Sequence, residues 1–205
     1  MWDSLDQIFC INLPERKERK VFAMSEFEKF TDFTAVKYLP AINARTLNIS
    51  SAVSFLTPGM VGCWLSHLSI YNYAKAFELN SFVVFEDDFK VISGGEILMK
   101  TALENIPEDW EFVWLGYSYN GHENNKKDEV FIKDYWMIPG STCCTHAYMV
   151  RGKKTIDFLL KNLTEIRNQI DLQLTYEVLK NSGIKVYAPT IPIFTQNGSK
   201  SDVQL

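Results

Sequence analysis

Three consecutive acidic residues, Glu86, Asp87 and Asp88, stand at the end of a short apolar run, 81–86, which reads Ser-Phe-Val-Val-Phe-Glu. Such a run is typical of a strand buried on both faces of a parallel sheet. Because buried charges are costly unless they are paired or coordinate a metal, the triplet indicates a cation site. Carboxylate oxygens suit Mg²⁺ or Mn²⁺, and a nucleoside diphosphate would complete the metal shell. A solvated turn after the strand is the alternative that an acidic triplet alone leaves open.

The segments around the triplet alternate between strands and helices. β-rich runs predict strands at 8–13, 35–39, 81–86, 111–115, 130–132 and 184–187. Apolar residues at helical intervals predict helices at 15–30, 62–79, 96–105, 153–162 and 171–181. This alternation predicts an α/β fold with an open sheet and right-handed crossovers. In such sheets, ligands bind beyond the carboxyl ends of the strands, which is where we expect the triplet.

The size and composition of the chain fit one packed domain. Its 205 residues are 46% hydrophobic and 22% charged, a balance that supports a buried core rather than disorder. The formal net charge of −4 argues against a nucleic-acid partner, since such partners are bound mainly by neutralising phosphates.

The sequence gives no sign of a membrane or an oxidising compartment. No apolar run reaches the ~20 residues that span a bilayer, and no apolar signal segment follows the first residues, so we predict a cytoplasmic protein without a transmembrane segment. The four cysteines have none of the paired spacings of a zinc site, and adjacent cysteines are poorly placed to bridge each other. We therefore predict reduced, mostly buried thiols at Cys10, Cys63, Cys143 and Cys144.

Seven short segments form a series along the chain. They are Ile11-Asn12-Leu13 followed by Arg16 and Arg19, Pro40 to Arg45, Gly62 to His67, Phe85 to Asp88, Ala147 to Val150, Asp171 to Leu174, and Gln196 to Val203. The most specific feature is a Gly-Cys-x-x-Ser-His segment about twenty residues before the Glu-Asp-Asp triplet. On these segments the sequence resembles the family-25 glycosyltransferases, which include bacterial lipooligosaccharide galactosyltransferases and collagen hydroxylysine galactosyltransferase domains.

This resemblance implies a fold and a reaction. The implied fold is of the glycosyltransferase A type, with a Rossmann-like, open and mostly parallel sheet flanked by helices. The implied reaction moves a hexose, with galactose favoured, from a UDP-sugar donor to a hydroxyl of a glycan or protein acceptor, with inversion and with Mn²⁺ or Mg²⁺ as cofactor. A single domain at 1–205 would then have a donor-binding half at about 1–115 and an acceptor-side half at about 116–205.

The resemblance also assigns roles to individual residues. Asp88 is expected to bind the metal directly, and Glu86 and Asp202 are expected to be further ligands. Glu86 or Asp87 is expected to contact the ribose, the donor sugar or a metal-bound water. The residues expected to bind the donor are Asn12, Arg16, Arg19, Asn43, Arg45, Ser66, Glu86, Asp87 and Gln196.

The expected catalytic residues are Asp171 and His67, and each has an ordinary structural alternative. Inversion requires a base that takes the proton from the acceptor hydroxyl, and Asp171 matches the family's Asp-x-x-Leu position. As the alternative, Asp171 is a helix N-cap. His67 has the alternative of a hydrogen-bonded structural histidine, and for His146 packing is the favoured interpretation. Arg16 and Arg19 have the alternative of surface charges on a helix.

Two other classes of function stay open at this point. Acidic strand ends also serve metal-dependent phosphohydrolases, although the nucleophilic Asp with a following Lys and Thr set is not arranged here. A non-catalytic module that binds a nucleotide sugar is the other alternative, because a fold alone does not establish activity.

Overall fold

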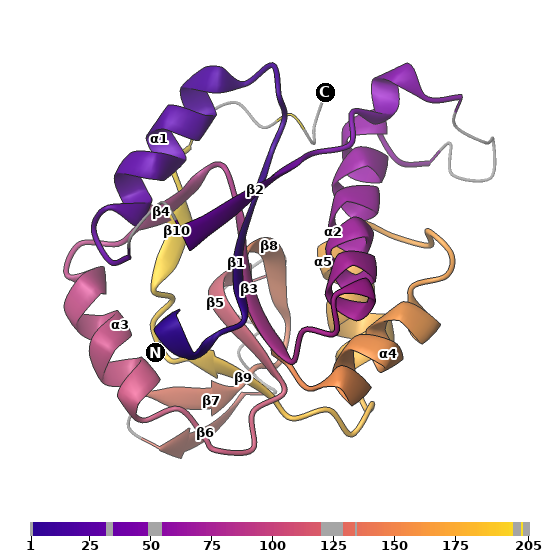
Figure 1. The fold of residues 1–205 in the computed structure, drawn as a ribbon. Coiled ribbons are helices and arrows are strands. Elements are labelled where there is room, and N and C mark those ends of the chain that lie inside the picture. The colour runs from indigo at the N-terminus through magenta and orange to yellow at the C-terminus, as the bar shows by residue number, and fades with distance from the viewer. Residues whose placement is uncertain are drawn as a thin grey trace.

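The structure is a computed structural model that describes residues 2–31, 35–48, 55–119, 129–133, 135–198 and 202 (Figure 1). A twisted sheet runs through the centre in the order β2-β1-β3-β8-β5-β9-β7-β6, and β10 joins it by pairing with β5 and β4. The strands are β1 (Gln7–Asn12), β2 (Val36–Pro40), β3 (Ser81–Glu86), β4 (Phe89–Val91), β5 (Phe112–Tyr119), β6 (Val130–Lys133), β7 (Trp136–Ile138), β8 (Thr142–Arg151), β9 (Val186–Pro189) and β10 (Phe194–Gln196).

Most of these strands run in one direction, as the predicted fold class requires. β1 pairs in parallel with β2 and with β3, and β5 pairs in parallel with β9 and β10. β8 lies antiparallel between β3 and β5 and joins the two parallel groups. The prediction of an α/β fold with a mostly parallel sheet flanked by helices is confirmed.

Helices cover both faces of this sheet (Figure 1). α1 (Lys17–Phe27) and α3 (Gly95–Glu104) pack on one face. α2 (Pro58–Ala76), α4 (Lys153–Asn162) and α5 (Ile170–Leu172) pack on the other, and α5 continues into the π-helical η6 (Gln173–Leu179). Short 3₁₀ turns, η1 (Trp2–Ser4) and η3 (Ala44–Thr46), complete the helical elements of the described ranges. None of the helices described is both long and apolar enough to cross a membrane.

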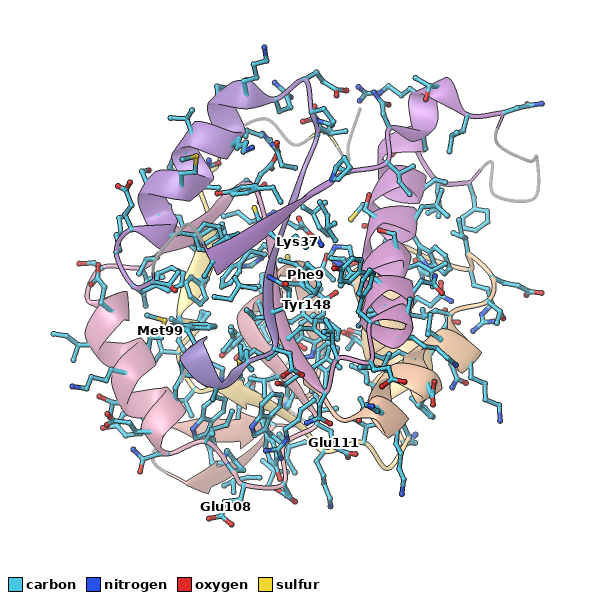
Figure 2. All side chains as sticks on the ribbon, in the orientation of Figure 1. Phe9, Lys37, Met99, Glu108, Glu111 and Tyr148 are labelled. Carbon is cyan, nitrogen blue, oxygen red and sulfur yellow. The ribbon has the colours of Figure 1, made fainter. Side chains whose placement is uncertain are left out.

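The core explains why the run at 81–86 forms a central strand. Alternate residues of β3 enter opposite faces: Phe82 and Val84 belong to the cluster under α2, while Val83 and Phe85 belong to the cluster under α1 and α3. All four are 0% exposed. Figure 2 shows the same division, with Phe9 and Tyr148 on the α2 side and Met99 on the α3 side. Each such buried side chain contributes about 1.5–3 kcal/mol relative to an exposed one.

A group of phenylalanines anchors the strand end that carries the acidic triplet. Phe85 lies 4.6 Å from Phe89 and 5.1 Å from both Phe27 and Phe194, measured between ring centroids. Tilted and edge-to-face pairs at these separations add to the burial energy. The backbone around Asp87 and Asp88 is therefore fixed by apolar packing on both sides.

The sequence located most elements but missed several strands. The predicted strand at 81–86 and helix at 153–162 coincide with β3 and α4, and the other predicted helices overlap α1, α2, α3 and α5 with η6. β9 begins and ends two residues later than the strand predicted at 184–187. β5 extends four residues beyond the end of the strand predicted at 111–115. The prediction contained no strand at β4, β7, β8 or β10. Three of these have only three residues, which is too short for a period to be recognised, and β8 begins with polar residues.

The start of α2 is fixed against the loop that follows β2. Thr57 caps the helix by accepting a hydrogen bond from the Met60 amide at 3.1 Å, and Pro58 occupies the first helical position. Gly62 faces the loop so closely that a Cβ there would overlap the carbonyl oxygen of Ile42. The absence of a side chain at Gly62 therefore sets the distance between α2 and the loop.

We expect Gly62→Ala to lower the free energy of unfolding by about 1–3 kcal/mol, because the loop backbone must shift to admit the methyl group. Urea denaturation of the purified protein measures the change. Asn72→Ala, an exposed position on the same helix, is the matched control and should change stability by less than about 0.5 kcal/mol. Equal effects of the two substitutions would contradict the close contact.

Candidate functional site

A pocket opens at the carboxyl ends of β1 and β3, between the first turns of α2 and the loop after β2. It brings together most of the residues that the sequence singled out. Those that line it are Arg19, Asn43, Arg45, Ser66, His67, Glu86, Asp87, Asp88, Gln196 and Asp202. Asn12, Arg16 and Asp171 do not line it, although Asn12 and Arg16 contact residues that do.

Asp88 is the carboxylate with an uncommitted oxygen. Its side chain is 5% exposed, and Oδ2 accepts a hydrogen bond from Nε2 of Gln196 at 3.3 Å. Oδ1 is buried and has no hydrogen-bond partner within the described part of the chain. Burial and the neighbouring Glu86 raise the pKa of Asp88 to about 7. A buried carboxylate oxygen that lines a pocket without a partner fits the binding of a cation.

Asp87, in contrast, is fully engaged. Its Oδ2 accepts a hydrogen bond from Nδ2 of Asn12 at 2.7 Å, and its Oδ1 pairs with Nη1 of Arg19 at 3.0 Å. Burial raises the pKa of Asp87 although both partners oppose the shift. These contacts tie the end of β3 to the end of β1 and to α1, so Asp87 holds the site together.

Glu86 is held by a chain of hydrogen bonds from the opposite side. Its Oε1 accepts from Oγ1 of Thr145 at 2.6 Å and lies 3.1 Å from Nε2 of His67. Nδ1 of His67 lies 2.9 Å from the hydroxyl of Tyr148. Burial opposes ionisation of Glu86, but hydrogen bonds from His67 and Thr145 and the His67 charge prevail, so the pKa is lowered. Since a carboxylate can only accept, Nε2 of His67 carries a proton.

The carboxylates of the pocket therefore suit a hard divalent cation. Glu86 and Asp88 both line the pocket, and oxygen donors of this kind are the ligands of Mg²⁺ and Mn²⁺. Cys63, His67 and Glu86 also place one ligand atom each within 4.8 Å of one another. In that group both His67 nitrogens and the Glu86 Oε1 already have hydrogen-bond partners.

Asp202 reaches the site from the C-terminal tail but contacts arginines. Its two carboxylate oxygens lie 2.8 and 2.6 Å from Nε and Nη2 of Arg16, and Oδ2 lies 3.7 Å from Nη1 of Arg19. Nη2 of Arg45 also donates to the backbone carbonyl of Asp202 at 3.3 Å. Burial opposes ionisation, but Arg16 outweighs it and lowers the pKa of Asp202. Its role as a metal ligand stays a prediction, and the observed contacts hold Asp202 against Arg16, Arg19 and Arg45.

Ser66 and Asn43 shape the wall of the pocket. The Ser66 hydroxyl accepts a hydrogen bond from the Ile42 amide at 2.8 Å and donates to the Gly62 carbonyl at 2.6 Å. Asn43 caps η3 by accepting from the Arg45 amide, and it donates to Glu15. Both side chains hold the loop after β2 in place, and their contact with a donor stays a prediction.

Asp171 lies beside the pocket, in the first turn of α5. Its Oδ2 accepts a hydrogen bond from the Cys144 amide and its Oδ1 accepts from the Leu172 amide, both at 2.8 Å. The carboxylate thus fixes the start of α5 against β8. The proposed role as base stays untested beside this structural one.

Several features of the site were not visible in the sequence. Thr145 supports Glu86 directly, yet it lies 59 residues away in a strand that was not predicted. His146 is a packed histidine, as favoured: Nε2 lies 3.2 Å from the Phe194 carbonyl, and burial lowers its pKa. All four cysteines are free; Cys10 is buried, and Cys63, Cys143 and Cys144 are partly buried, so none of the four is an exposed residue.

A sequence model described as glycosyltransferase family 25 (LPS biosynthesis protein) matches residues 5–174. The curated relatives include a rat protein named "Probable inactive glycosyltransferase 25 family member 3", 28% identical over 166 residues, which are 70% of this chain and 27% of the relative. Human procollagen galactosyltransferase 2 is 28% identical over 130 residues, which are 54% of this chain and 20% of that protein. The chain thus spans about a quarter of the length of these relatives.

Solved structures share the fold at low sequence identity. A glycosyltransferase involved in glycosylating the major capsid of PBCV-1 has a TM-score of 0.57 and 8% identity, with 95% of this chain and 93% of that chain covered. A mannose-1-phosphate geranyltransferase from Thermus thermophilus has a TM-score of 0.50 and 10% identity, with 92% and 74% covered. At these identities the likenesses show the fold alone.

In metal-free protein, we expect Asp88 to make folding less favourable as the pH rises from about 4 to about 7. The unfolded carboxyl loses its proton near its ordinary pKa of 3.8, whereas the folded one keeps it until about 7. Between these values the folded state binds more protons, so rising pH favours unfolding. Asp88→Asn should therefore gain stability over the native chain, on the order of 4 kcal/mol at pH 8 and less than about 1 kcal/mol at pH 4.

Urea denaturation in EDTA at the two pH values measures this difference. Asp157→Asn, an exposed residue paired with Lys75, is the control and should show no pH-dependent gain. A gain for Asp88→Asn that is the same at both pH values would contradict the raised pKa.

Proposed function

We propose that this chain, which belongs to glycosyltransferase family 25, transfers a hexose from a UDP-sugar to a hydroxyl of a glycan or protein acceptor, with inversion and with Mn²⁺ or Mg²⁺ as cofactor. The observation that carries the proposal is the buried Oδ1 of Asp88, which has no partner in the part of the chain that the structure describes and lies in a pocket beyond the carboxyl ends of β1 and β3. The procollagen galactosyltransferases among the relatives support galactose as the sugar.

Asp88 and Glu86 are the residues that would hold the divalent cation. Asp88 offers its free Oδ1, and Glu86 is kept ionised by His67 and Thr145. Asp87 is less suited to a direct bond because Asn12 and Arg19 occupy both of its oxygens. A bound divalent cation supplies neutralisation of the charge that develops on a departing diphosphate.

The remaining wall of the pocket suits a diphosphate. Arg19 and Arg45 line it and bring two permanent positive charges. Gly59 and Gly62 line it from the first turns of α2, where the helix dipole and the backbone amides favour an anion. Positive groups and carboxylates thus line the same pocket, a combination that a metal-bound diphosphate needs.

His67 and Asp171 have different tasks in this proposal. His67 is 0% exposed and hydrogen-bonded through both nitrogens, so it positions Glu86. Asp171 is partly exposed beside β8 and is our candidate for the base that takes the acceptor proton.

A donor-binding domain without turnover is the second candidate function. It is favoured by the rat and bovine relatives, whose names contain the word inactive. In that case the pocket would bind the UDP-sugar and its cation and release no UDP.

We expect Asp88→Asn to reduce UDP release from UDP-galactose by at least about 100-fold while the fold is retained, because the cation loses its free carboxylate oxygen. A coupled assay with Mn²⁺, repeated in EDTA, measures release, and circular dichroism monitors the fold. Asp157→Asn should match the native chain.

Three results would oppose the transferase. Release that persists in EDTA would remove the metal from the proposal. Calorimetric binding of UDP-galactose without turnover on any acceptor would favour the second candidate. Liberation of inorganic phosphate from simple phosphomonoesters would indicate a phosphohydrolase.

We expect Asp171→Asn to lower kcat for transfer by about 10²–10⁴-fold while the Kd for the UDP-sugar stays unchanged. The amide oxygen of Asn can still accept the Cys144 hydrogen bond, but the bond from the Leu172 amide is lost, so circular dichroism must first show that the variant keeps the fold. Steady-state kinetics and calorimetry separate the two quantities. Glu177→Gln, on the same helix, is the control. An unchanged kcat, or a loss of donor affinity alone, would rule out Asp171 as the base.

A further inference from the structure

The start of β8 carries an irregularity that places two cysteines together. Gly116 of β5 pairs with Ala147 of β8, and Ser118 pairs with Cys143. A step of two residues along β5 therefore corresponds to a step of four residues along β8. Extra residues of this kind form a bulge that redirects side chains. In a regular strand, neighbouring side chains point to opposite faces. Here the Sγ atoms of Cys143 and Cys144 both lie 3.2 Å from the Ser118 hydroxyl, so the bulge turns both thiols to one side.

The backbone conformation at Cys144 is unfavourable for a residue with a side chain. Its φ is 76°, in the left-handed region, which is strained for a residue other than glycine. Glycine would take the same conformation without strain. The fold therefore maintains a cysteine where its backbone alone would favour glycine, and strain of this kind is concentrated at functional sites.

A carboxylate from a distant part of the chain completes the group. Asp171, at the start of α5, accepts the Cys144 amide hydrogen bond at 2.8 Å. One ligand atom each from Cys143, Cys144 and Asp171 lies within 4.8 Å of the others. All three residues are partly exposed, so an ion can reach them from solvent.

We propose that Cys143, Cys144 and Asp171 form a binding site for a thiophilic divalent cation of the Zn²⁺ class, separate from the carboxylate pocket at Asp88. Zn²⁺ binds sulfur at ~2.3 Å and carboxylate oxygen at ~2.0–2.2 Å, so tetrahedral ligand atoms lie roughly 3.3–3.8 Å apart. The three ligand atoms lie within 4.8 Å of one another, so the group reaches these separations by contracting by at most about 1.5 Å. Two sulfurs and one oxygen leave a fourth position for water.

The two sites differ in the hardness of their ligands. Mn²⁺ and Mg²⁺ prefer all-oxygen sets such as the pocket carboxylates, whereas thiolates select Zn²⁺. The other sulfur-containing group, Cys63 with His67 and Glu86, includes a histidine that is 0% exposed, whereas all three residues of the proposed site are partly exposed. The proposal does not rest on transferase activity, although a cation at Asp171 would occupy the carboxylate that we propose as the base.

Titration of the reduced full chain with Co²⁺ tests the site, because Co²⁺ bound to thiolates gives a near-ultraviolet charge-transfer band that oxygen ligands do not give. We expect one equivalent to produce this band and Zn²⁺ to displace it. Cys143→Ser and Cys144→Gly should abolish it, and Asp171→Asn should weaken binding by at least about tenfold. Cys144→Gly suits the left-handed backbone, so loss of the band there cannot be attributed to unfolding.

Cys63→Ser and Asp88→Asn are the matched controls, because they change the other sulfur-containing group and the carboxylate pocket. Both should keep the charge-transfer band at full intensity. The absence of any such band in the native chain would overturn the proposal. A band that survives Cys144→Gly and disappears in Cys63→Ser would also overturn it, and would assign the thiolate ligand to Cys63.

Discussion

The desolvation of three successive carboxylates at the end of a buried strand is the constraint on which this site depends. Residues 82–85 of β3 are entirely enclosed, so Glu86, Asp87 and Asp88 leave the core with little access to water. Each must find compensation locally, because an isolated buried charge is too costly to keep. Asp87 obtains it from Arg19 and Asn12, and Glu86 obtains it from His67 and Thr145. Of the three, only Asp88 has a buried oxygen without a hydrogen-bond partner among the described residues, and burial together with Glu86 raises its pKa to about 7.

The same contacts make the site rigid. Through Asp87, the end of β3 is joined to β1 and α1; through Glu86, it is joined to α2 and β8. Apolar packing of Phe85 against Phe27, Phe89 and Phe194 fixes the backbone between these ties. A carboxylate held by such a frame does not need to reorganise when a cation binds, which is the condition under which electrostatic stabilisation is most effective.

The sequence predicted what depends on local pattern and missed what depends on long-range pairing. The apolar run at 81–86 identified a central strand, and the acidic triplet after it identified the site. The partner of each carboxylate was hidden, because Asn12 and Asp87 are 75 residues apart and Thr145 and Glu86 are 59 apart. The cysteine spacing suggested no metal group, because a regular strand would separate Cys143 from Cys144. Only the bulge and the distant Asp171 bring that group together.

The antiparallel strand β8 explains how the pocket at the carboxyl ends of the parallel strands is enclosed by strand residues as well as by loops. In an open parallel sheet, the crevice beyond the strand ends is bounded only by loops. Here β8 enters between β3 and β5 with its first residues at that same edge. Thr145 reaches Glu86, Tyr148 reaches His67, and the Cys144 amide reaches Asp171. A single inserted strand thus supports the pocket carboxylate Glu86 on one side and holds Asp171 on the other. The bulge at Cys144 changes the direction of β8, so that the same strand contacts Glu86 through Thr145 and Asp171 through the Cys144 amide.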